Sequence, residues 1–103
     1  MILRRRFSDV IRRQLDLFVE DHRGLIEDCA AAERAYNRAP RDEAEERYGD
    51  YVDLVETGTE ILADIRDTYK RTLDDDTADE YDLAFNRAVV KRLPRFALEI
   101  ENR

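Results

Sequence analysis

Apolar and small side chains between residues 42 and 73 recur at alternating spacings of three and four. This spacing places them on one face of an α-helix. The positions on this face are Tyr48, Tyr51, Val52, Val55, Gly58, Thr59, Leu62, Ile65, Tyr69 and Leu73. The face continues for more than three heptads, so an isolated helix would expose a long apolar stripe to water. We therefore predict a helix over residues 41–73 that packs against at least one other helix.

The same spacing immediately upstream predicts the partner helix, over residues 3–37. Its apolar face contains Phe7, Val10, Ile11, Phe18, His22, Leu25, Ile26, Cys29, Ala32 and Tyr36. Gly24 interrupts this helix at a cost of roughly 1 kcal/mol relative to Ala. No other turn residue accompanies Gly24, so we expect a continuous helix with at most a bend. Pro40 ends it, because a proline disfavours helical geometry in the preceding residue and suits the first turn of a new helix.

A third helix is predicted over residues 77–93. Thr77 and Glu80 have the spacing of a capping box, in which each side chain accepts a hydrogen bond from the backbone of the other residue. Apolar positions at helical spacing follow, and Pro94 ends the helix. The tail, residues 94–103, fits either a short helix or a docked extended segment, since its apolar residues are compatible with both periods.

These elements predict an all-α fold and one domain over residues 1–103. Two helices of about 30 residues joined by a short turn form an antiparallel, coiled-coil-like hairpin about 45 to 50 Å long. The third helix completes a three-helix bundle, but it reaches only about halfway along the hairpin at ~1.5 Å per residue. The apolar residues that it leaves uncovered are Leu25, Ile26, Cys29, Tyr36, Tyr48, Tyr51 and Val52. We expect the tail or a second copy in a two-fold homodimer to cover them.

Composition agrees with long solvated helices, because 42% of the 103 residues are charged and only three are glycine. The net charge of −7 favours solubility and argues against nucleic acid as a partner of the whole molecule. Cys29 is the only cysteine, so no internal disulfide can form. The N-terminal residues lack the apolar run of a signal peptide, and no stretch approaches the ~20 apolar residues of a membrane span. We expect a reduced, cytoplasmic protein.

Charge is nevertheless segregated along the chain. Residues 1–14 carry five arginines and one acid, whereas residues 74–82, at the same end of the predicted bundle, carry six acids and no base. At the other end, we expect Asp42, Glu43, Glu45 and Glu46 to meet Arg87, Lys91, Arg92 and Arg95. Mutual pairing accounts for both sets. The alternative is a basic segment that docks on nucleic acid or an anionic membrane, formed by Arg4, Arg5, Arg6, Arg12 and Arg13.

We predict no metal site and no cofactor. His22 is the only histidine and lies on the apolar face, where such a residue is most often part of the core. As an alternative, His22 could bind a metal ion with acids of the neighbouring helix, of which Glu56 and Glu60 are candidates. Cys29 is about 10 Å further along the helix axis, too far to share the same ion.

The sequence contains no recognisable catalytic motif. There is no glycine-rich phosphate loop, no nucleophile elbow and no second histidine. His22 and Cys29 share a face but lie about two turns apart, beyond the ~3 Å that a general base requires. We therefore expect a non-enzymatic protein that binds itself or another protein through its apolar, tyrosine-rich helix faces.

Overall fold

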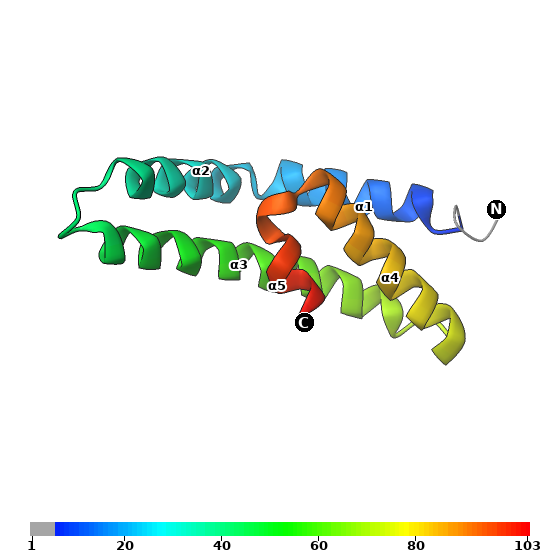
Figure 1. Ribbon diagram of the computed structural model, residues 1–103. Helices are drawn as coiled ribbons and strands as arrows, with labels where there is room; N and C mark the ends of the chain where they lie inside the picture. The colour runs from blue at the N-terminus through cyan, green and yellow to red at the C-terminus, as the bar shows by residue number, and fades with distance from the viewer. Residues whose placement is uncertain (1–5) are drawn as a thin grey trace.

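The computed structural model describes residues 6–103, and it is all-helical in this range (Figure 1). The helices are α1 (Ser8–Asp21), α2 (Arg23–Arg38), α3 (Ala44–Lys70), α4 (Asp75–Arg92) and α5 (Ala97–Glu101), with a 3-10 turn, η2 (Pro94–Phe96), before α5. The predicted all-α class is thereby confirmed. None of the helices within residues 6–103 combines the length and apolar character needed to cross a membrane.

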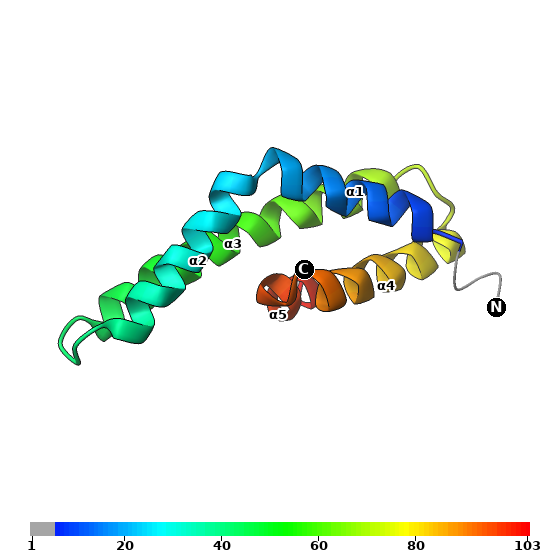
Figure 2. The ribbon, with the colours of Figure 1, turned by 90° about the horizontal axis from the view of Figure 1, so that it is seen from above.

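The helices form a bowed hairpin with a second, shorter layer on its concave side. α1 and α2 run antiparallel to α3, and α4 and α5 lie inside the bow (Figure 2). α4 packs against both α1 and α3, and α5 folds back against α3 and α4. The molecule measures 51 × 24 × 23 Å. Its radius of gyration is 15.6 Å, against about 13 Å for a compact chain of about 100 residues.

The helix predicted over residues 3–37, for which a bend was allowed, is divided at His22 into α1 and α2. His22 has φ −121° and ψ 32°, outside helical values. The backbone hydrogen bonds nevertheless continue, since the His22 N–H donates to the Phe18 carbonyl at 2.9 Å and the Ile26 N–H donates to the His22 carbonyl at 3.0 Å. The junction is therefore a kink rather than a loop. Gly24 lies inside α2, two residues beyond the kink. Residues 3–5 of the predicted helix lie outside the described residues.

α3 is shorter than predicted, ending at Lys70, and α4 begins two residues earlier than predicted. Asp74 is the N-cap of α4, because its carboxylate accepts a hydrogen bond from the Thr77 N–H at 2.9 Å. That backbone hydrogen bond lowers the pKa of Asp74. The predicted Thr77–Glu80 capping box is wrong. Asp is at least as good an N-cap as Thr, and the earlier start also places Asp75 and Asp76 in the first turn.

The core lies where α1, α3, α4 and the tail meet. Fully buried side chains from all of them share it: Leu15, Phe18, Leu62, Tyr81, Phe85, Val89, Phe96 and Ile100. Phe96 is 5.9 Å from Phe18 between ring centroids, edge to face, and lies directly over Gly58. Gly58 therefore makes room for the phenyl ring of the tail.

Candidate interaction surface

The half of the hairpin nearest the turn extends beyond the second layer. We call this part the arm and define it as α2, the turn at residues 39–43 and residues 44–54 of α3. α4 ends at Arg92, and the chain turns back at Pro94 instead of continuing along α2 (Figures 1 and 2). Within residues 6–103, no third helix runs along the arm, and only the residues after α4 reach its base, where Arg95 contacts Glu33.

Six of the seven residues predicted as an interaction surface are at least partly exposed on this arm. Tyr36 is 38% exposed and Tyr48 is 51% exposed. Their rings lie 5.2 Å apart between centroids and join α2 to α3 near the turn. The other four, which are half-buried, are Leu25, Ile26, Tyr51 and Val52. Tyrosine provides a large contact area together with a hydroxyl that can remain hydrated, which is typical of interfaces.

Cys29, the seventh predicted residue, is completely buried inside the chain. It therefore cannot contribute to an exposed surface. Burial raises the pKa of the Cys29 thiol, and the nearby guanidinium of Arg95 opposes that effect only in part. A buried, protonated thiol is a poor nucleophile. Cys29 is a small apolar core residue in this fold.

A cavity of about 520 Å³ lies where the arm meets the end of α4. Apolar side chains supply most of its lining, with three charged residues among them: Ile26, Glu33, Tyr51, Arg92, Leu93, Pro94, Arg95 and Phe96. Arg95 donates a hydrogen bond to Glu33 at 2.9 Å. Burial would lower the pKa of Arg95, but contacts with Glu33 and Tyr51 raise it overall. The buried Nε of Arg95 has no hydrogen-bond partner among the described residues.

The basic N-terminal segment is only partly engaged. Arg6 forms an ion pair with Glu80 of α4 at 3.5 Å, and Arg12 pairs with Asp9 of its own helix at 3.1 Å. Arg13 is exposed. Arg4 and Arg5 lie outside the described residues.

The charge pairing predicted at the other end of the bundle is wrong. Arg92 pairs with Asp16 of α1, and Arg95 pairs with Glu33 of α2, because α4 ends near the middle of the hairpin. At the turn, Arg47 of α3 pairs at 3.6 Å with Glu43, the residue that precedes the helix. The acidic turn and the basic end of α4 are therefore separate surfaces within one chain.

The candidate metal ligands are not brought together. His22 is half-buried, and its ring lies 5.3 Å from the ring of Phe18. Glu56 and Glu60 are exposed on α3. No group of three or more His, Cys, Asp or Glu side chains in residues 6–103 is arranged to hold a metal ion.

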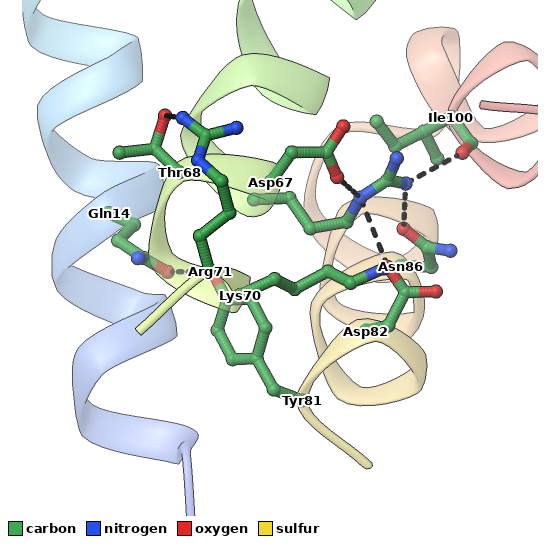
Figure 3. Close-up of polar contacts among 10 residues, drawn as sticks. Gln14, Asp67, Thr68, Lys70, Arg71, Tyr81, Asp82, Asn86 and Ile100 are labelled. Carbon is green, nitrogen blue, oxygen red and sulfur yellow. Dashed lines mark hydrogen bonds and ion pairs between the residues drawn. The ribbon is translucent and has the colours of Figure 1, made fainter. Parts of the chain in front are cut away.

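A buried polar cluster centred on Arg66 was missed in the sequence (Figure 3). Arg66 is 2% exposed. Its Nε lies 2.9 Å from Asp67 and 3.1 Å from Asp82, and its Nη1 donates to Asn86 at 3.0 Å and to the Ile100 carbonyl at 3.1 Å. The cluster fastens α5 to α3 and α4.

A signal for this cluster was present in the spacing. Arg66 follows Leu62 by four residues and Thr59 by seven, so it occupies the apolar face of its helix. A second buried polar contact, also drawn in Figure 3, joins α4 to α1, where the Tyr81 hydroxyl donates to Gln14 at 2.9 Å. Both contacts connect helices within the chain.

No family model, curated protein sequence or solved structure matches this chain.

Proposed function

We propose that this protein acts without catalysis, by protein–protein contact, and that it forms a homodimer through the face of the arm that bears Tyr36 and Tyr48. The observation that carries this proposal is the exposed Tyr36–Tyr48 pair on a hairpin that α4 does not reach. The half-buried apolar residues beside that pair extend the surface to the cavity at the end of α4.

A physical reason for association is the missing layer. Helices in stable domains bury their apolar stripe against another layer of secondary structure. In the body of the molecule α4 and α5 supply that layer, whereas the arm has only its two helices. A second arm laid on the first would complete a four-helix arrangement. A two-fold axis lets the same surface serve both copies.

The two side chains considered for catalysis favour a non-catalytic role. His22 packs on Phe18, and Cys29 is buried with a raised pKa. No contact among the described residues favours the alternatives of a metal-binding protein or a factor that docks on an anionic polymer.

Sedimentation equilibrium or light scattering across the micromolar range tests the proposal. We expect twice the chain mass of 12.2 kDa. Tyr48→Glu should raise the dissociation constant at least about tenfold, because aromatic residues are common hot spots of interfaces. Leu98→Glu is the matched control, since Leu98 is 75% exposed on α5, outside the arm. A wild-type protein that stays monomeric throughout this range would refute the proposal.

A further inference from the structure

In the homodimer proposed above, the second arm could run parallel or antiparallel to the first. The distribution of surface charge favours one of these two directions. Residues 41–50, around the turn, carry five acids and two arginines. Residues 83–98, which contain the end of α4, carry four bases and no acid. The two segments do not pair with each other within the chain.

Both surfaces have charges available to a partner. Arg87 and Lys91 are exposed, lie four residues apart on α4, and take part in no ion pair found within residues 6–103. Exposed apolar side chains accompany them, with Leu83 at 59% and Val90 at 41%. The end of α4 therefore presents basic and apolar groups together.

The acids at the turn are equally available. Asp42, Glu45 and Glu46 are exposed, and the ion pairs of the described residues do not include them. They lie next to the start of α3, only a few residues from Tyr48. A partner surface that accepts the Tyr36–Tyr48 pair would therefore also meet these acids.

The length of the arm fits one orientation. α2 has 16 residues, which corresponds to about 24 Å at ~1.5 Å per residue. The end of α4 lies at the base of the arm, where Arg92 and Arg95 line the same cavity as Ile26. Two arms that overlap antiparallel over their whole length would place the turn of each copy at the end of α4 of the other. Parallel arms would bring the two acidic turns together, which like-charge repulsion disfavours.

We propose that, in the homodimer of the preceding subsection, the arms pair antiparallel, and the acidic turn of each copy docks on the basic end of α4 of the second copy. Arg87 and Lys91 face Asp42, Glu45 and Glu46 across the interface. The Tyr36–Tyr48 pair lies towards the cavity at the base of the opposite arm.

The surface charges determine the relative orientation of the two arms more than they determine the affinity of the dimer. An exposed ion pair contributes less than about 1 kcal/mol, but the two-fold axis repeats the set twice in each dimer. Complementary charge also speeds association and is screened by salt. We therefore expect the dissociation constant to rise as ionic strength increases.

Two charge-reversed variants test the orientation. The turn variant carries Glu45→Lys and Glu46→Lys, and the α4 variant carries Arg87→Glu and Lys91→Glu. Each variant alone places like charges at both contacts of its homodimer, so its dissociation constant should rise at least about tenfold. An equimolar mixture should recover near-wild-type affinity, because in the mixed dimer each reversed surface meets its complement. Glu60→Lys with Asp64→Lys, at exposed acids of α3 outside the arm, is the net-charge control for the turn variant, because both pairs of substitutions replace two acids by two lysines.

The outcomes separate this inference from the proposed function. A wild-type monomer would refute the dimer itself. A wild-type dimer whose affinity the two variants leave unchanged would overturn the orientation alone. Weakened variants that fail to recover on mixing would overturn it as well. Circular dichroism of each variant checks that the helices are intact.

Discussion

Replacing Gly58 by alanine tests how the tail packs on the hairpin. A Cβ added at Gly58 would lie 2.5 Å from Cε1 and 2.9 Å from Cζ of Phe96. Phe96 is 1% exposed, and its ring also lies edge to face on Phe18. The ring therefore cannot withdraw without disturbing the core.

Two effects of opposite sign determine how much Gly58→Ala changes the free energy of unfolding. Overpacking a core costs about 1 to 3 kcal/mol, whereas alanine in place of glycine inside a helix contributes about 0.5 to 1 kcal/mol. The variant should therefore lose up to about 2.5 kcal/mol of unfolding free energy. Gly49→Ala is the matched control in the same helix, because a Cβ at Gly49 meets nothing within 4 Å. It should be more stable than the wild type by about 0.5 to 1 kcal/mol.

The difference in unfolding free energy between Gly58→Ala and Gly49→Ala isolates the contact with Phe96. We expect about 1 to 3 kcal/mol, which corresponds to a difference in Tm of at least about 4 °C for a domain of about 100 residues. Urea and thermal unfolding measure it, with all variants at one protein concentration because association shifts the apparent stability. In the Gly58→Ala background, Phe96→Leu should restore part of the lost unfolding free energy. If Gly58→Ala stabilises the protein as much as Gly49→Ala, the packing of Phe96 on Gly58 is wrong.

Two buried polar contacts give further predictions. Arg66→Met should lower the unfolding free energy by about 1 to 3 kcal/mol and increase amide exchange in α5, because the Ile100 carbonyl and Asn86 lose their donor; unchanged exchange in α5 would contradict this role. Burial raises the pKa of Tyr81. The phenol of Tyr81 ionises near pH 10 in the unfolded chain and at a higher pH in the folded chain. The free energy of unfolding is therefore unaffected by this ionisation below pH 10 and falls as the pH rises above 10. Absorbance at alkaline pH should show one of the five tyrosines ionising only on unfolding, and Tyr81→Phe should abolish that step.

Several features followed from the sequence because they depend on local repeats. The spacing of apolar residues gave the helical class, and Pro40 gave the place of the turn. The mismatch in helix length was also available from residue counts, and the arm is in fact left without a third helix. The tail has the helical form, one of the two that its spacing allowed.

Tertiary structure alone decided which side chains distant in the sequence come into contact. The packing of Phe96 on Gly58 and the burial of Arg66 both depend on where α4 and the tail pack. The separation of the acidic turn from the basic end of α4 has the same cause. Helical periodicity is a property of neighbours along the chain, so a sequence can contain it. Which side chain fills a groove depends on segments distant in sequence, and only the packed chain determines it.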